Sequence, residues 1–447
     1  MMKRPRVLGV VAAGAAVALA AAGCGGGGGD GGSEAGGGAN RASAPGVTAT
    51  TVTIGSHQPL TGPAAPGYSK ISAAAKAYFD YVNANGGVHG RKIVYKYMDD
   101  VYNPTQTVDV VHKLVLQDKV FAIFNGLGTP THTKVVDYLN AQRVPDLFVA
   151  SGCACWDQPK AHPYTFGWQT NYIREGKILG QHIRQTMAGK KIAYFYQNDD
   201  FGQDGVKGVD KYIPASQVVS RQSYQPGNTD IGPQAQAIAQ AKADVVVLFT
   251  IPSYTALFRL AQLKLNSKAQ LVVSNVGSDP TTLTGLLENF AKQAGTDLEG
   301  NPLIQGIITD SYGTPIGDKS NKWVQLWTKV HNQYIPKLPL DGNISFGFGA
   351  AYTFVQALQA AGKNPTRQSL VEAVENTKFT GPGLVPFGYS KDSHSGYTGV
   401  QIGTIKGNAV VLQGEPLVTD AGDGPIQPYT EPQQPPPGNG IPPAPAG

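Results

Sequence analysis

The chain has 447 residues, two to three times the length of one ordinary domain, so we expect two lobes rather than a single small fold. With 41% hydrophobic and 15% charged residues, the composition excludes a coiled coil, a collagen and a chain that is disordered throughout. The formal charge of +5 includes no basic block, which excludes nucleic acid as the main partner, because that affinity depends on clustered lysine and arginine.

Residues 1–24 have the pattern of an export signal peptide. Three basic residues precede an apolar, alanine-rich run over 7–22 that is too short for a stable membrane span. The run ends in Gly23-Cys24, which resembles the box of bacterial lipoproteins, so we expect cleavage there and lipidation of Cys24. An ordinary signal peptide that leaves Cys24 free is the alternative. Loss of the three basic residues lowers the formal charge to +2.

Residues 25–46 are glycine-rich and lack an apolar period, which predicts a flexible tether. Beyond them, short β-branched or aromatic runs alternate with amphipathic stretches, and this alternation indicates β-α units around a parallel sheet. In the first helix, Ile71, Tyr78 and Val82 share one face, and Gly86-Gly87 ends it. The first series has strands over 51–55, 92–98, 120–124 and 147–149, and helices from 71, over 104–117 and from 131.

A second series of the same build begins near Thr170. Its predicted strands cover 191–196, 218–224, 244–249, 271–274 and 304–309, and its helices cover 172–187, 204–212, 231–241 and 254–265. Helices over 321–334, 345–361 and 367–376 follow, and then a closing hairpin over 400–412. Residues 419–447 are rich in proline without hydrophobic spacing, which predicts an extended or disordered tail.

Several motifs recur in a characteristic order along the body of the chain. The most specific is the run from Asn83 to Arg91, Asn-Ala-Asn-Gly-Gly-Val-His-Gly-Arg. It is accompanied by Leu60-Thr61-Gly62-Pro63, Phe201-Gly202, Asp244-Val245-Val246 and Phe379-Thr380-Gly381. Over roughly residues 50–415 this pattern resembles the Leu/Ile/Val-binding family of ABC-transporter substrate-binding lipoproteins, among the type I periplasmic binding proteins.

The resemblance implies an α/β fold of two doubly wound parallel-sheet lobes joined by a three-strand hinge. On this reading lobe 1 comprises residues 47–170 and 312–385, and lobe 2 comprises residues 171–311 and 386–418. In open parallel sheets a ligand lies at the carboxyl ends of the strands, where helix N-termini present free N–H groups. We therefore expect the binding site in the cleft between the lobes.

Two loops at strand ends are expected to hold a ligand carboxylate. After strand 120–124 the resemblance places Leu127, Gly128 and Thr129 on contacting positions, with Thr129 as a helix N-cap. Ordinary capping without a ligand is the alternative. The second loop is Ala150-Ser151-Gly152, in which Gly152 replaces the serine or threonine that is usual in the family.

Four apolar or aromatic residues are candidates for the opposite wall of the predicted site, and the core is the alternative place for them. Phe201 takes the place of a family tyrosine, while Tyr68, Ile251 and Tyr254 are candidates that fit the core equally well. The family holds the ligand ammonium with an acidic side chain at a position where this chain has Asn275, with Asp279 four residues later. A neutral amide binds an ammonium more weakly than a carboxylate does.

Cys153 and Cys155 follow the second loop, and an exported protein allows disulfides, so we expect them to be bridged. A metal site there would need a third ligand such as His162, and none is expected. The chain lacks the nucleophile elbow, phosphate loop and zinc motif of common enzymes. Asp99-Asp100 and Asp199-Asp200 are expected at strand ends and turns rather than in acid-base pairs.

These patterns together predict a non-enzymatic, cofactor-free receptor, lipid-anchored outside the cytoplasm. It would bind a small carboxylate-bearing solute, which is a branched-chain or other amino acid or a related organic acid, and pass it as a monomer to an ABC permease. A receptor that signals to a membrane sensor is the alternative. Ligand that contacts both lobes would stabilise their closure.

Overall fold

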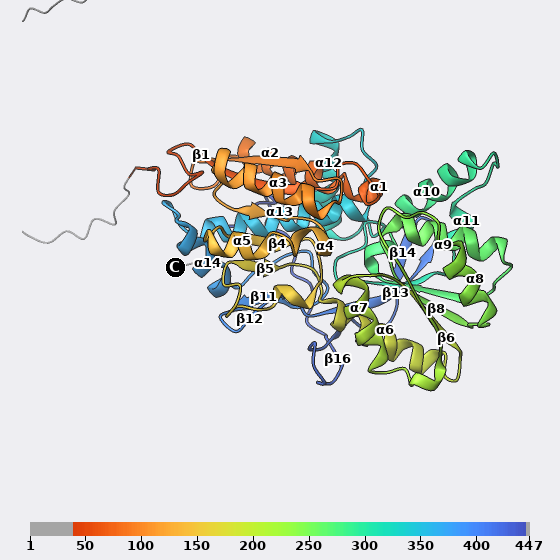
Figure 1. Ribbon diagram of the computed structural model, residues 1–447. Coiled ribbons are helices and arrows are strands. Elements are labelled where there is room, and N and C mark those ends of the chain that lie inside the picture. The colour runs from red at the N-terminus through yellow and green to blue at the C-terminus, as the bar shows by residue number, and fades with distance from the viewer. Residues whose placement is uncertain (1–38, 444–447) are drawn as a thin grey trace, which may run out of the picture. The chain divides into compact units, whose positions relative to one another are not determined.

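The computed structural model describes residues 39–443. The predicted signal peptide, Cys24 and the first part of the predicted tether lie outside these residues. From Asn40 onward the described chain forms one compact unit that contains two large sheets. In Figure 1 the sheet that contains β1 and β4 lies on the left together with its helices, and the sheet that contains β6 and β8 lies on the right together with its helices.

Lobe 1 is built on a parallel sheet with the order β2-β1-β3-β4-β5. β1 and β2 pair over their full length, from Thr51 opposite Lys92 to Gln58 opposite Asp99. The strands are β1 (Thr51–Gln58), β2 (Lys92–Asp99), β3 (Ile123–Phe124), β4 (Asp146–Val149) and β5 (Thr165–Gly167). The helices are α1 (Ala65–Tyr68), α2 (Ile71–Ala84), α3 (Pro104–His112) with η1 (Lys113–Gln117), α4 (Thr129–His132), α5 (Val136–Ala141), α12 (Lys322–Tyr334), α13 (Gly342–Ala360) and α14 (Arg367–Asn376).

Lobe 2 is built on a mixed sheet with the order β16-β15-β13-β10-β9-β8-β6-β7, and β14 pairs with β13. The strands from β7 to β10 run parallel, as predicted, whereas β13 is antiparallel to β10. The strands are β6 (Ile192–Gln197), β7 (Val218–Tyr224), β8 (Val245–Phe249), β9 (Gln270–Val273), β10 (Ile308–Ser311), β13 (Gly399–Lys406), β14 (Ala409–Leu412), β15 (Leu417–Val418) and β16 (Gln427–Pro428). The helices are α6 (Tyr172–Thr186), α7 (Asp200–Asp210), η3 (Ala215–Gln217), α8 (Gly232–Gln240), α9 (Pro252–Lys264), η4 (Asn275–Gly277), α10 (Pro280–Gln293) and α11 (Asn301–Ile304).

Three segments pass between the two sheets, at 168–171, 311–313 and 397–399. Two of them are joined by hydrogen bonds, because the Tyr397 amide donates to the Trp168 carbonyl at 3.2 Å and the Thr170 hydroxyl donates to the Gly399 carbonyl at 2.7 Å. This arrangement matches the predicted three-strand hinge.

The lobe boundary predicted at residue 386 needs correction. A hairpin of β11 (Phe387–Ser390) and β12 (Ser393–Tyr397) packs on lobe 1, where the Tyr389 hydroxyl donates to the Gly167 carbonyl at 2.5 Å and His394 stacks on Phe166. The chain therefore enters lobe 2 only at β13. The aromatic faces of the hairpin are buried against β5, which explains its placement.

Residues 40–46 also differ from the predicted tether, since they pack on lobe 1. Asn40 donates from its side chain to the His89 carbonyl at 2.9 Å, and the Ser43 hydroxyl donates to the Pro365 carbonyl at 2.7 Å. The buried Arg91 guanidinium donates to the Arg41 carbonyl at 3.0 Å. A glycine-rich sequence thus gives way to ordered chain where partners for its backbone are available.

The proline-rich tail is ordered over 419–443, contrary to the prediction. On lobe 2 the buried Lys177 ammonium donates to the carboxylate and carbonyl of Asp420 and to the carbonyls of Gly422 and Gly424, at 2.9–3.0 Å. On lobe 1 the Trp323 indole donates to the Gln434 carbonyl at 2.7 Å, and Ile441 joins the core. Proline has no backbone N–H group, so a proline-rich segment has few donors for its own carbonyls. Side chains of the body supply these donors instead.

No helix within residues 39–443 combines the length and the hydropathy needed to cross a membrane.

Candidate functional site

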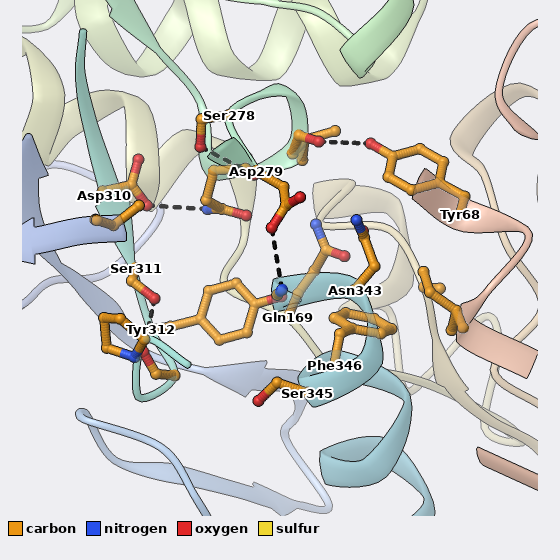
Figure 2. Close-up of a pocket in the computed structure, with 18 of the residues that line it drawn as sticks. Tyr68, Gln169, Ser278, Asp279, Asp310, Ser311, Tyr312, Asn343, Ser345 and Phe346 are labelled. Atoms are coloured by element: carbon orange, nitrogen blue, oxygen red, sulfur yellow. Dashed lines mark hydrogen bonds between the residues drawn. The ribbon is translucent and has the colours of Figure 1, made fainter. Parts of the chain in front are cut away.

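A cavity of about 200 Å³ lies between the lobes. Figure 2 shows Tyr68 from α1, Asp279 and Asp310 from lobe 2, and Asn343 and Phe346 from α13 around it. Of the predicted ligand-binding residues, nine line this cavity: Tyr68, Leu127, Gly128, Thr129, Ala150, Phe201, Ile251, Asn275 and Asp279. Ser151, Gly152 and Tyr254 do not.

The first carboxylate loop connects β3 to α4, which is a single turn. Gly128, not Thr129, occupies the N-cap position, with φ of 108° that favours glycine. The Thr129 hydroxyl is hydrogen-bonded to the Ser151 hydroxyl at 2.7 Å, and the Thr129 amide has no acceptor among the residues that the structure describes. Thr129 lines the cavity, so its unpaired amide is available to a ligand there, and the single turn of α4 adds little of the field of a long helix.

The structure explains why glycine stands at position 152. A Cβ there would clash with the Thr170 carbonyl and lie 2.9 Å from the ring of Tyr172. Ser151 and Gly152 are buried behind the cavity wall, with Ser151 held by Thr129. The second loop therefore supports the first, and only Ala150 of its three residues lines the cavity.

Two tyrosines that sequence reasoning missed lie against these loops. The ring of Tyr102 is 2.5 Å from where a Cβ of Gly128 would stand, and Tyr172 packs on Gly152. Both line the cavity and both are buried. Burial raises the pKa of the Tyr172 phenol, although hydrogen bonding from Gly152, Ser151 and Thr129 opposes the shift. The sequence around Asn171-Tyr172 does not indicate a ligand site, because Tyr172 reaches the two loops only when α6 is packed in the folded protein.

On the lobe 2 wall, Phe201 and Ile251 face the cavity and Tyr254 does not. Phe201 contacts Tyr172 with ring centroids 4.6 Å apart. Tyr254 instead stacks on Tyr224 with centroids 3.8 Å apart, and its hydroxyl accepts from the Gly227 amide at 2.8 Å. Tyr254 is thus a core residue of lobe 2, one of the two alternatives left open by the sequence.

Two buried carboxyl groups bond Asn275, which stands where the family has a single acidic side chain. The Asn275 side-chain amide donates to both Glu175 and Asp310 at 2.9 Å, and its backbone amide donates to Glu175 at 2.9 Å. Burial raises the pKa of Glu175, and burial together with the charge of Glu175 raises the pKa of Asp310 well above its ordinary range. Two carboxyls this close share a proton, so the pair carries about one negative charge.

The charge of the cavity lining is one-sided. Asp279 and Asp310 line it, and no lysine, arginine or histidine does among the described residues. Aromatic rings of Trp168, Tyr312 and Phe346 supply much of the apolar wall. A lining of carboxylates and aromatic faces favours a ligand with a positively charged group at this end.

The two lobes are in contact across the cavity, so the structure is a closed form. The Tyr68 hydroxyl donates to the Val276 carbonyl at 2.6 Å, and the Gly342 amide donates to the Asp279 carboxylate at 3.0 Å. The Asn343 side chain donates to the Thr282 hydroxyl at 3.2 Å. Asp279 therefore both caps α10 and holds lobe 1 to lobe 2.

Cys153 and Cys155 have Cα atoms 5.1 Å apart, with their sulfur atoms placed for a bridge. The bridge stays a prediction. Asp200 lies beside the two sulfur atoms, whereas His162 is bonded to Asp137 at 2.8 Å. The third ligand that the sequence suggested for a metal is therefore engaged elsewhere.

The family described as periplasmic binding protein matches residues 51–409, which include both sheets and the cavity between them. The chain belongs to this family. Its members bind solutes and do not transform them, so the prediction of a non-enzymatic binding protein is confirmed. As a periplasmic binding protein the chain works outside the cytoplasm, which is where the predicted signal peptide would direct it.

Similar proteins confirm the predicted resemblance and fold. A "Leu/Ile/Val-binding protein homolog 3" from Brucella melitensis is 24% identical over 198 residues, and the match spans 44% of this chain and 53% of that protein. This chain thus spans about half the length of that relative. A fatty acid ABC transporter substrate-binding protein from Thermomonospora curvata has a TM-score of 0.74 at 22% identity, covering 87% of this chain and 98% of that one. A branched-chain amino acid ABC transporter protein from Thermus thermophilus, solved with bound valine, has a TM-score of 0.70 at 19% identity, covering 83% and 97%.

Proposed function

We propose that the protein is a lipid-anchored solute receptor that binds a small carboxylate-bearing ligand, an amino acid, and delivers it as a monomer to an ABC permease. The observation that carries this proposal is a cavity enclosed by both lobes, with the unpaired amide of Thr129 on one wall and the buried carboxyl group of Asp310 on the other, each within the described part of the chain. The printed names of relatives and solved neighbours, which include Leu/Ile/Val-binding proteins and a valine complex, support it.

An amino acid fits the two walls by its two charges. The ligand carboxylate would accept from the amide and hydroxyl of Thr129, on the lobe 1 side. The ligand ammonium would lie toward Asn275 and Asp310, where the paired carboxyls supply the negative charge that Asn275 lacks. Charge-assisted hydrogen bonds of this kind are short and strong in a site closed to water.

Delivery would follow from lobe closure. Ligand touches both lobes only when they are closed, so its differential affinity shifts the population toward that form. The permease would recognise the closed surface, and a lipid on Cys24 would keep the receptor at the membrane. Acyl chains anchor a protein reversibly in proportion to the apolar surface that they bury.

The test is calorimetric titration of the purified protein with L-leucine, L-leucinamide and 4-methylpentanoate, followed by basic and aromatic amino acids. Leucinamide lacks the carboxylate and 4-methylpentanoate lacks the amino group, so each is expected to bind about tenfold more weakly or worse than leucine. Thr129→Ala is expected to weaken leucine binding about tenfold.

Thr133→Ala is the matched control, because Thr133 lies four residues along the same segment, does not line the cavity, and donates from its hydroxyl to the Pro130 carbonyl at 3.3 Å. Equal leucine affinity in the two variants would contradict the carboxylate assignment. Absence of binding by every amino acid tested would contradict the proposed function itself.

A further inference from the structure

The segment that follows β4 makes hydrogen bonds to both lobes. The Ser151 hydroxyl bonds the Thr129 hydroxyl at 2.7 Å and accepts from the Cys153 amide at 3.2 Å, so the segment supports the ligand loop of lobe 1. The Ala154 amide donates to the Asp204 carboxylate at 2.8 Å, and Asp204 belongs to α7 of lobe 2. One short segment therefore links the Thr129 loop to the opposite lobe.

The bond to Asp204 lies one helical turn from the cavity wall. Phe201, which lines the cavity, and Asp204 are three residues apart on α7, so they lie on one face of this helix. Burial raises the pKa of the Asp204 carboxyl, and the hydrogen bond from Ala154 opposes the shift. A carboxylate that accepts an amide proton in a partly buried place forms a stronger bond than a neutral acceptor does. The contact therefore adds to the bonds that hold the lobes closed.

Cys153 and Cys155 flank Ala154 in the chain. Their Cα atoms are 5.1 Å apart, which is within the range that a disulfide spans. A bridge between them closes a small ring that contains the peptide group between Cys153 and Ala154. Rotation of this peptide group would turn the Ala154 amide away from Asp204, and the ring restricts that rotation. The bridge would thus fix the donor of the bond between the lobes.

We propose that Cys153 and Cys155 are bridged and act as positioning residues that hold the Ala154 amide on Asp204, so that reduction of the bridge loosens the closed form and weakens ligand binding. The inference rests on the proposed function for its ligand readout only. An exported protein meets an oxidising environment, in which such a bridge persists. Cys153 is buried and Cys155 is partly exposed, so a reductant reaches the sulfur of Cys155 first.

Reduction by a dithiol such as dithiothreitol opens the ring around Ala154. A thiolate of the reductant attacks Cys155 Sγ, the bond between the two cysteine sulfurs breaks, and Cys153 leaves as a thiolate that takes up a proton. The second thiol of the reductant then displaces Cys155, which becomes a thiol, and the reductant becomes a cyclic disulfide. Because the opened ring is small, the unfolded chain gains little freedom, so we expect both lobes to stay folded.

The first measurement is the mass of the tryptic peptide 144–160 from the full, unreduced protein, since this peptide contains both cysteines. The peptide is expected to lack the two thiol hydrogens and to resist alkylation. Alkylation without prior reduction would overturn the inference. Asp200 lies beside the two sulfur atoms. Zinc that the wild-type protein retains and Cys153→Ala loses would also overturn it, because thiolates that hold a metal are not bridged.

The second measurement is X-ray scattering of the ligand-free protein at pH 8, with and without dithiothreitol. The reduced protein is expected to have the larger radius of gyration. Its affinity for L-leucine, measured by calorimetry, is expected to fall about threefold to tenfold. Cys153→Ser combined with Cys155→Ser is expected to behave like the reduced protein and not to respond to dithiothreitol. Thermal unfolding verifies that each form is folded.

Asp204→Ala tests whether the bridge acts through the bond between the lobes. This variant lacks the acceptor, so its effect and that of reduction are expected not to add, and reduction is expected to change its leucine affinity less than about twofold. Asp200→Ala is the matched control, because Asp200 is exposed on the same helix beside the sulfur atoms, whereas the Ala154 amide donates to Asp204. The control is expected to keep the full effect of reduction.

A radius of gyration that does not change on reduction would overturn the inference. So would a reduction that weakens leucine binding equally in Asp204→Ala and in the wild-type protein. If leucine does not bind in any form, the amino-acid form of the proposed function fails separately, and the scattering of the ligand-free protein then decides the inference by itself.

Discussion

The Asn275 side chain bonds two carboxyl groups, so negative charge lies next to this position although Asn275 itself is neutral. Its amide donates to Glu175 and Asp310, and all three lie at or beside the cavity wall. The cost of burying two carboxyls is partly relieved by one shared proton and one shared amide. The site therefore keeps a negative charge near position 275 at the expense of stability.

Asp310→Asn is expected to stabilise the protein and weaken ligand binding together. An amide at 310 supplies the donor that the shared proton supplies now. Because the pKa of Asp310 is raised in the folded protein, this carboxyl does not lower the free energy of unfolding below pH 3.8, its ordinary pKa. As the pH rises above 3.8, the unfolded chain loses the proton first, and the carboxyl lowers the free energy of unfolding more and more. The gain in the free energy of unfolding is thus expected to be on the order of 1–2 kcal/mol at pH 8 and smaller at pH 4.5. Urea unfolding and leucine titration measure the two effects, and a variant that is less stable at pH 8 would refute this account.

At the scale of elements, the tail after β15 is the feature that most changes the expected molecule. It leaves lobe 2 beside Lys177, passes the hinge where Gln433 donates to the Thr314 hydroxyl at 2.8 Å, and reaches lobe 1 at α2. There the hydroxyls of Tyr78 and Tyr81 donate to the carbonyls of Gly440 and Asn439 at 2.7 and 2.5 Å. The tail is thus a fourth connection between the lobes.

Truncation after Thr419 is expected to lower the free energy of unfolding by about 3 kcal/mol or more, because the buried Lys177 ammonium loses all its acceptors and the core loses Ile441. Asp423→Asn is the control, since Asp423 is exposed in the same loop and forms an ion pair with the surface residue Lys211. Thermal and urea unfolding compare the two. A truncated protein as stable as the full chain would show that the tail does not stabilise the body.

For the whole molecule, closure depends on a few hydrogen bonds at the rim of the cavity. Tyr68 makes one of them to lobe 2, and Asp279 accepts another from lobe 1. Each bond of this kind contributes only about 1 kcal/mol net. Loss of one therefore shifts the balance between open and closed forms without unfolding either lobe.

Tyr68→Phe is expected to raise the radius of gyration of the ligand-free protein in X-ray scattering and to weaken leucine binding about threefold to tenfold. Tyr254→Phe removes the same atom from a hydroxyl that bonds Gly227 and Gln225 within lobe 2. That control is expected to lower stability but leave the scattering and the affinity unchanged. If both variants behave alike, the Tyr68 bond does not govern closure.

The sequence by itself determined the α/β lobes, the order of their elements and the family, because hydrophobic periodicity and turn residues act over a few neighbouring positions. It also located the Thr129 loop and Asp279, which follow strands directly. Only the tertiary structure decided that Glu175 and Asp310 meet at Asn275, that His57 meets His132, and that the tail is ordered. The sequence separation is 35 residues between Asn275 and Asp310, 75 between the two histidines, and 243 between Lys177 and Asp420 of the tail. No local pattern encodes such distances, since the residues lie on separate helices, strands and the tail, which meet only in the folded protein.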